Sequence, residues 1–186
     1  MSGRAGVAFA ACALSIACIS HAQQFELVEA TIDDVHAAFD AGTLTCEDLV
    51  DGYLARIDAY DQRGPELNSI KLINPNARDE AEALDAAFES DGLVGPLHCV
   101  PVLLKDQVET RDMPTTYGSA VFEGFVSGRD ATIVERMSDA GAIILAKTNM
   151  GEYAFSYVGS SFGMVRNAYD PTRLPSGSSA GTGAAV

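Results

Sequence analysis

The chain has 186 residues and a formal net charge of −14 at pH 7, because 26 aspartates and glutamates outnumber 12 lysines and arginines. Hydrophobic residues make up 47% of the sequence and charged residues 20%, a balance typical of one globular domain and not of a disordered chain. An acidic surface repels nucleic-acid phosphates and anionic lipid head groups. We therefore expect neither nucleic acid nor a membrane surface as a partner.

Residues 1–22 have the pattern of a secretory signal peptide. Arg4 supplies positive charge, residues 5–19 form an uncharged and mostly apolar run, and small residues precede Gln23 at the predicted cleavage site. The run is shorter than the roughly 20 apolar residues that span a membrane. We predict an exported protein, periplasmic or secreted, with a mature part of residues 23–186 and no stable membrane association. An uncleaved anchor and a lipidated Cys18 are the alternatives.

Helix and strand patterns alternate along the mature chain. Helices are predicted after Thr31, after Thr45 and after Asn74-Pro75, and strands over residues 69–73, 99–104 and 142–146. A further helix is expected to be capped by Asp130 and closed by Gly141. From Gly159 onward glycine, serine and proline accumulate, and residues 184–186 resemble the first turn of another helix. The alternation predicts an α/β fold, with a sheet covered by helices.

Two lysines, Lys105 and Lys147, each follow a short apolar strand. A lysine in this position is either a surface residue with a buried stem or a desolvated base whose pKa lies well below the usual value of about 10.4. Composition does not distinguish the two lysines.

A Gly/Ser-rich loop covers residues 176–183 and is either a flexible linker or a loop that presents backbone N–H groups and hydroxyls to a substrate. Residues 177–181 also match G-x-S-x-G, the nucleophile elbow of α/β-hydrolases, with Ser179 as the nucleophile. That elbow follows a hydrophobic strand, whereas residues 170–176 (DPTRLPS) cannot form a central strand. The context therefore argues against the elbow.

The mature part contains two cysteines, Cys46 and Cys99. Export permits a disulfide between them, but two buried thiols explain the sequence equally well. The sequence contains no C-x-x-C and no H-E-x-x-H pattern, so we expect no metal and no other cofactor.

Several segments, taken together, resemble the amidase signature family. Residues 95–106 (GPLHCVPVLLKD) are similar to the family's lysine motif, residues 115–119 (TTYGS) to its TTxGS segment, and residues 140–152 (AGAIILAKTNMGE) to the next block. Residues 166–170 (RNAYD) and 176–186 (SGSSAGTGAAV) are similar to its N-P-Y-D and GGSSxGSxAAV segments. The resemblance covers nearly the whole mature chain in the right order. Cys99 and Ser176 depart from it, because each stands where the family usually has glycine.

The resemblance implies a mixed β-sheet covered by helices on both faces, here incomplete at the C-terminus. It also implies a Ser-Ser-Lys amidase in which Lys105 is the base, Lys147 is structural, and Ser178 carries a cis peptide bond and relays the proton. The nucleophilic serine of the family lies in a later D-[IV]-G-G-S motif, which does not occur before Val186. No histidine is required, so His36 and His98 are expected to be structural.

Three functions remain as hypotheses. The first is hydrolysis of a small amide or of a C-terminally amidated peptide. The second is the glutamine-hydrolysing component of a tRNA amidotransferase, against which the predicted signal peptide argues. The third is an inactive binding fragment, since residues 1–186 by themselves are expected to lack amidase activity.

Overall fold

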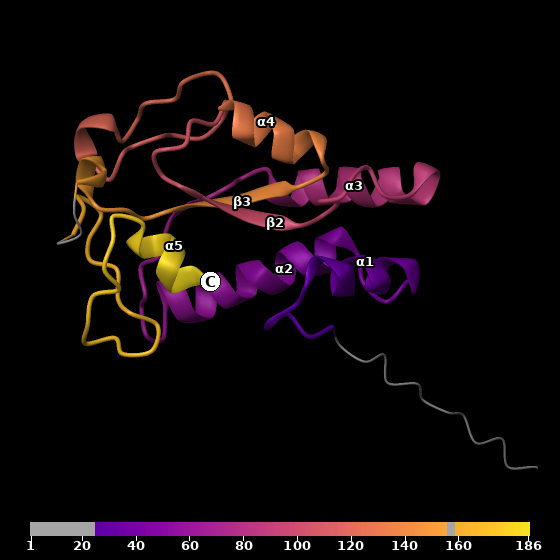
Figure 1. Cartoon of the computed structure of the whole chain (residues 1–186), viewed down its shortest axis with the longest axis horizontal. Coiled ribbons are helices and arrows are strands. Elements are labelled where there is room, and N and C mark those ends of the chain that lie inside the picture. The colour runs from indigo at the N-terminus through magenta and orange to yellow at the C-terminus, as the bar shows by residue number, and fades with distance from the viewer. Residues whose placement is uncertain (1–24, 156–158) are drawn as a thin grey trace, which may run out of the picture.

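The computed structural model describes residues 25–155 and 159–186. The predicted signal peptide therefore lies outside the described residues. Figure 1 shows helices on either side of a small central sheet. The helices are α1 (Ile32–Asp40), α2 (Cys46–Arg56), α3 (Ala77–Asp91), α4 (Thr132–Asp139) and α5 (Ala180–Ala185). Shorter helical segments are η1 (Ile57–Gln62), η2 (Ala120–Phe122) and η3 (Glu152–Ala154), and the strands are β1 (Ile70–Ile73), β2 (Pro101–Lys105) and β3 (Ile143–Thr148).

The three strands form one mixed sheet in the order β1-β3-β2. Strand β3 lies in the centre, antiparallel to β1 and parallel to β2. All six residues of β3 are buried, as expected for a strand covered on both faces. The α/β class and the mixed sheet are both confirmed.

Two clusters of buried side chains cover the two faces of the sheet. Ile143 and Leu145 pack in one cluster with residues of α1, α2 and α3. Ile144 packs in the other cluster, with Val134 of α4. In Figure 1, α4 accordingly lies on one side of β2 and β3, and α1, α2 and α5 lie on the other. The helices on both faces that the resemblance implied are confirmed.

The first two helices begin where the sequence predicts. Thr31 accepts a hydrogen bond from the backbone N–H of Asp34, whose carboxylate accepts one from the Thr31 backbone N–H, so a complete capping box starts α1. Thr45 caps α2 by accepting from the Asp48 backbone N–H at 3.0 Å. These local signals suffice because the cap and its partner lie within four residues.

Two helix starts differ from the prediction. The N-cap of α4 is Ala131 and not Asp130, because the Asp130 carboxylate accepts the Arg111 backbone N–H at 2.7 Å instead. Helix α5 starts at Ala180, inside the Gly/Ser-rich loop, and not at residue 184. It forms there because Ala180, Gly181 and Ala184 are buried, and tertiary packing outweighs the weak helix propensity of glycine.

Within residues 25–155 and 159–186, no helix has both the length and the apolar character that a bilayer crossing requires.

Candidate active site

Lys105, the last residue of β2, points at the Gly/Ser-rich loop that precedes α5. Its Nζ donates a hydrogen bond to the Ser178 Oγ at 2.8 Å. Both residues are partly buried, and burial lowers the pKa of Lys105 from its ordinary value. The two residues singled out from the sequence, 73 positions apart, are therefore in direct contact. An amine with a lowered pKa beside a hydroxyl is able to accept the proton of that hydroxyl.

The sheet register separates the two candidate lysines. Val102 of β2 pairs with Ile144 of β3, but the next residue, Leu103, pairs with Ala146, so β3 contains one extra residue. After this bulge Leu104 pairs with Lys147, and Lys105 pairs with Thr148. Residues paired across strands share a face, whereas neighbours along a strand alternate. Lys105 and Lys147 therefore project from opposite faces of the sheet.

Lys147 is fully buried in a set of acceptors that matches its ammonium group. Its Nζ lies 3.1 Å from the Pro114 carbonyl oxygen, 3.0 Å from the Thr115 Oγ1 and 3.5 Å from the Asp106 Oδ1. Burial lowers the pKa of Lys147 from its ordinary value, and the Asp106 carboxylate opposes this shift in part. Because three acceptors surround its three donors, we assign the charged form to Lys147. The donors of Lys147 are all engaged within the protein, which favours Lys105 as the candidate base.

Asp106 directly follows Lys105 but faces away from it. Its carboxylate pairs with Lys147 and accepts hydrogen bonds from the Thr116 backbone N–H and hydroxyl. The backbone N–H of Asp106 donates to the Thr148 carbonyl oxygen at 3.1 Å. Both the backbone and the side chain of Asp106 thereby fix the end of β2. Sequence reasoning assigned no role to Asp106, although it belongs to the lysine motif.

The loop that carries Ser178 is fixed to the end of β3. The Gly151 N–H donates to the Ser178 carbonyl oxygen at 2.9 Å, and the Gly181 N–H donates to the Asn149 carbonyl oxygen at 2.9 Å. The hydroxyls of Thr148 and Thr182 lie 2.9 Å apart. The peptide bond between Gly177 and Ser178 is cis, as the resemblance implied. These contacts make residues 176–183 an anchored loop and helix start, and not a flexible linker.

Asn149 connects this loop to two other segments. Its Nδ2 donates to the Asn68 carbonyl oxygen at 3.2 Å, and its Oδ1 accepts from the Ser160 hydroxyl at 2.8 Å. Its backbone N–H donates to the Ser69 carbonyl oxygen at 2.7 Å. Little in the sequence signals this role. These partners of Asn149 lie 11 or more positions away along the chain, and two of them are backbone carbonyl groups. The one local signal is that Asn149 follows Lys147 by two residues.

The remaining sequence candidates are Ser179, His36 and His98. Ser179 is exposed, and residues 164–179 contain no strand, so the context that a nucleophile elbow requires is missing. His36 Nε2 lies 3.2 Å from the His98 carbonyl oxygen, and the buried His98 ring packs against Phe39 and Phe88. The contacts of both histidines are thus with the backbone and the aromatic core, which agrees with the expected structural role.

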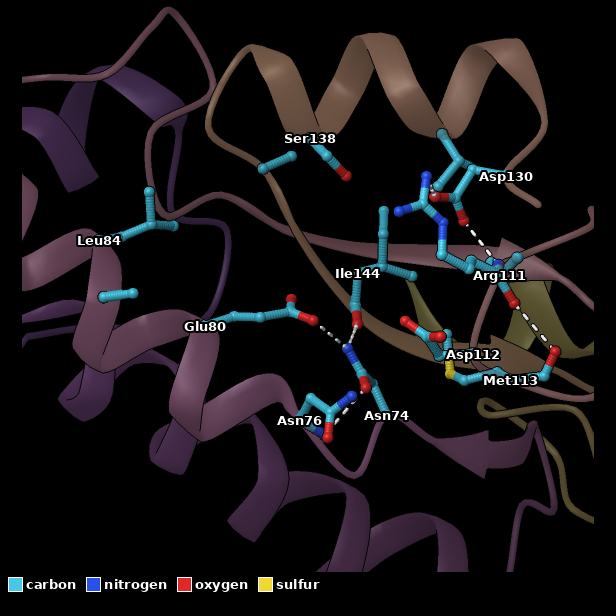
Figure 2. A pocket seen from close by; sticks show the side chains of 14 residues that line it. Asn74, Asn76, Glu80, Leu84, Arg111, Asp112, Met113, Asp130, Ser138 and Ile144 are labelled. Atoms are coloured by element: carbon cyan, nitrogen blue, oxygen red, sulfur yellow. Dashed lines mark hydrogen bonds and ion pairs between the residues drawn. The ribbon is translucent and has the colours of Figure 1, made fainter. Parts of the chain in front are cut away.

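A cavity of about 340 Å³ opens between α3 and α4, and its lining includes neither Lys105 nor Ser178. Figure 2 shows Asn74 reaching toward Glu80, with an Nδ2–Oε1 distance of 3.0 Å, and Arg111 beside Asp130. These four polar side chains are thus engaged with one another in two pairs. Nothing in this cavity connects it to the chemistry of the lysine–serine pair.

A sheet covered on both faces, together with a lysine–serine pair at its edge, defines an amidase-type α/β protein. The sequence profile of the Amidase family matches residues 48–186, and the chain belongs to this family, the amidase signature family. Similar proteins of known structure or function agree with this assignment.

The native peptide amidase of Stenotrophomonas maltophilia superposes with a TM-score of 0.82 at 38% identity, covering 86% of this chain and 34% of that one. An amidase family protein from Bacillus anthracis gives a TM-score of 0.80 at 38% identity, covering 86% and 33%. The A-type component of the glutamyl-tRNA(Gln) amidotransferase from Acidothermus cellulolyticus is 40% identical over 164 residues, which is 87% of this chain and 32% of the relative. The chain therefore spans about a third of the length of the relatives it matches.

Proposed function

We propose that the full-length gene product is an amidase that hydrolyses a carboxamide C–N bond by a Ser-Ser-Lys mechanism. The observation that carries the proposal is the 2.8 Å contact between the Lys105 Nζ and the Ser178 Oγ. Lys105 is the base and Ser178 the relay. The nucleophile is a serine of the family's D-[IV]-G-G-S type, located beyond residue 186.

The chemistry follows from the protonation of Lys105. With Lys105 neutral, its Nζ takes the proton of the Ser178 hydroxyl while Ser178 takes the proton of the attacking serine. The attacking serine forms an ester with the acyl group of the substrate, and the returned proton lets ammonia or an amine leave. Water then releases the acid by the same route. The lowered pKa of Lys105 supports the neutral form that this sequence of steps requires.

We propose a small amide or a C-terminally amidated peptide as the substrate. The peptide amidase of S. maltophilia supports this class, being similar in fold and 38% identical. The second candidate is the A-type component of a tRNA amidotransferase, which the names of the similar curated relatives favour. The predicted signal peptide supports the first candidate, because export separates the protein from cytosolic tRNA. We accordingly propose a periplasmic or secreted location.

The test measures ammonia released by the purified full-length gene product from an amidated dipeptide and, separately, from glutamine. We expect turnover of the amidated peptide; release from glutamine alone would favour the amidotransferase function. Ser178→Ala and Ser179→Ala form a matched pair of variants. We expect a loss of at least about 100-fold for Ser178→Ala, as for removal of a proton-transfer group, and a small effect for Ser179→Ala. The opposite order would point to the nucleophile elbow.

The chain of residues 1–186 supplies the complementary test. If the nucleophile lies beyond residue 186, this chain by itself releases no ammonia from either substrate. Turnover by it would overturn the proposed position of the nucleophile and leave the family assignment untouched.

A further inference from the structure

Cys46 and Cys99 are both completely buried and belong to the same core cluster. Their Cα atoms are 5.4 Å apart, within the range that a disulfide spans without backbone movement, and their sulfur atoms are joined in the structure. The pair links α2 to the segment that leads into β2, across 53 positions of sequence. None of the catalytic steps proposed above uses either cysteine.

The backbone at Cys99 is the second observation. Cys99 has a φ of 60°, in the left-handed region that glycine adopts readily and a residue with a Cβ adopts rarely. This is the position where the sequence departs from the glycine usual in the family. A cysteine at this position has an unfavourable backbone conformation. A disulfide to Cys46 offsets that cost and explains why the residue is a cysteine and not a glycine.

The turn at Cys99 is held on two sides. Its backbone N–H donates to the Gly141 carbonyl oxygen at 2.8 Å, next to the start of β3, and its side chain reaches Cys46 at the start of α2. The Asp85 carboxylate of α3 in turn accepts the Cys46 backbone N–H at 2.7 Å. The turn is therefore connected to α2, α3 and the start of β3. Two residues later it becomes β2, the strand that ends in Lys105.

A metal is the competing occupant, because Cys46, His98 and Cys99 place three ligand atoms within 4.8 Å of one another. The His98 ring argues against it. Its Nδ1 accepts the Val94 backbone N–H at 3.3 Å, so the proton of a neutral ring lies on Nε2, which faces the Cys46 sulfur at 3.8 Å. A histidine binds a metal through the lone pair of one ring nitrogen, and here Nε2, the nitrogen that faces the sulfur, carries the proton while the lone pair of Nδ1 is already used by Val94.

We propose that Cys46 and Cys99 form a native disulfide in the exported protein, which fixes the left-handed turn that starts the Lys105 strand. Two thiols lose two protons and two electrons as the S–S bond forms. A thiol–disulfide oxidoreductase of the exporting compartment accepts them, and its own disulfide is reduced to a dithiol. The proposal does not depend on amidase activity.

The first test is chemical. The protein is exported from cells, treated with an alkylating reagent while native and again after denaturation, digested without reductant and analysed by mass spectrometry. We expect the Cys46 and Cys99 peptides to be joined and two hydrogens lighter than the separate thiol peptides. Alkylation of both cysteines after denaturation would overturn the proposal. One equivalent of zinc bound to the same protein would overturn it in favour of a metal site.

The second test asks whether the bond fixes the turn, and uses Cys46→Ser, Cys99→Ser and Cys99→Gly. All three remove the disulfide, but only Cys99→Gly relieves the left-handed backbone at that position. We expect the melting temperature to fall by about 5–15 °C in both serine variants. We expect a smaller fall in Cys99→Gly, and faster amide hydrogen exchange over residues 95–105 in the serine variants. Equal melting and exchange of Cys46→Ser and the oxidised parent would show that the bond does not fix the turn.

Discussion

Lys147 and Asp106 form an ion pair inside the protein, with the Nζ and Oδ1 3.5 Å apart and side chains that are 0% and 1% exposed. The pair lies on the face of the sheet opposite to Lys105, although Asp106 is the next residue in the sequence. It holds the start of the 106–117 segment against β3, because Asp106 also binds Thr116. The pair also keeps the Asp106 carboxylate bound to Lys147 and not to Lys105, the lysine beside it in the sequence.

Lys147→Met is expected to destabilise the protein by about 3–5 kcal/mol, because it leaves the Asp106 carboxylate buried without its charge partner. Chemical denaturation with urea measures this loss. The double variant Lys147→Met/Asp106→Asn removes both charges and is expected to lose less than the two single variants summed. Additive losses would show that the two side chains do not interact.

Lys105 gives a prediction on pH. Burial lowers the pKa of Lys105, and the proposed base must be neutral, so amidase activity rises with pH through that lowered pKa and is lost as pH falls through it. Lys105→Ala is expected to reduce kcat/KM by about 100- to 10,000-fold at neutral pH. The assay compares rates of ammonia release over a pH series. Lys71→Ala, which removes a lysine that lies over the Phe162 ring, is the control. A Lys105→Ala enzyme with unchanged activity would exclude Lys105 as the base.

The same lowered pKa affects stability with a defined sign. Between the lowered pKa of folded Lys105 and the ordinary value of about 10.5, the unfolded chain binds the proton and the folded chain does not. The contribution of Lys105 to the free energy of unfolding therefore rises with pH across that window. Lys105→Met is expected to flatten this part of the stability profile, measured by urea denaturation at several alkaline pH values. An identical profile in the variant would contradict the lowered pKa.

The sequence predicted well what depends on neighbours along the chain. The caps at Thr31 and Thr45, the alternating elements and the approximate strands all follow from spacing within a few residues. The choice between Lys105 and Lys147 does not, because it depends on a bulge in β3 that shifts the register and decides which face each lysine occupies. Family motifs singled out Lys105, the lysine that contacts Ser178 in the structure, whereas periodicity of the strands alone does not separate the two lysines.

Long-range contacts account for the remaining differences. Asp130 has the sequence position of a helix cap, but its carboxylate binds the Arg111 N–H, 19 residues earlier. At the start of α2, the Cys46 backbone N–H donates to the Asp85 carboxylate, 39 residues away on α3. Helix α5 begins among glycines because the fold buries it. In each case a partner distant in sequence outweighs a local preference, and no local pattern contains that partner.

Asp85→Ala tests one of these distant contacts. The Asp85 carboxylate accepts the backbone N–H groups of Cys46 and Glu47 at 2.7 and 3.1 Å, which satisfies two donors in the first turn of α2. We expect a loss of about 1–2 kcal/mol, comparable to the removal of a strong helix cap. Urea denaturation measures the loss, with Asp79→Ala, at an exposed residue in the first turn of α3, as the control. A loss no larger than that of the control would mean that Thr45 alone is a sufficient cap.

Gly181 and Gly183 provide a matched pair within α5. A Cβ at Gly181 would lie 2.4 Å from the carbonyl oxygens of both Asn149 and Ser69, whereas a Cβ at Gly183 would meet nothing within 4 Å. Gly181→Ala must therefore displace backbone, and we expect it to destabilise the protein by about 1–3 kcal/mol. Gly183→Ala is expected to be neutral or stabilising by up to about 1 kcal/mol, because alanine favours the helix.

Urea denaturation of both glycine variants measures the difference in stability, and ammonia release from the full-length gene product measures the effect on the site. Gly181 lies three residues after Ser178, and its N–H donates to the Asn149 carbonyl oxygen. Displacement of Gly181 is therefore expected to move the Ser178 hydroxyl away from the Lys105 Nζ. We therefore expect Gly181→Ala to lower kcat as well as stability, while Gly183→Ala retains activity. If the two variants are equally stable and equally active, the close packing of α5 against the end of β3 does not position Ser178.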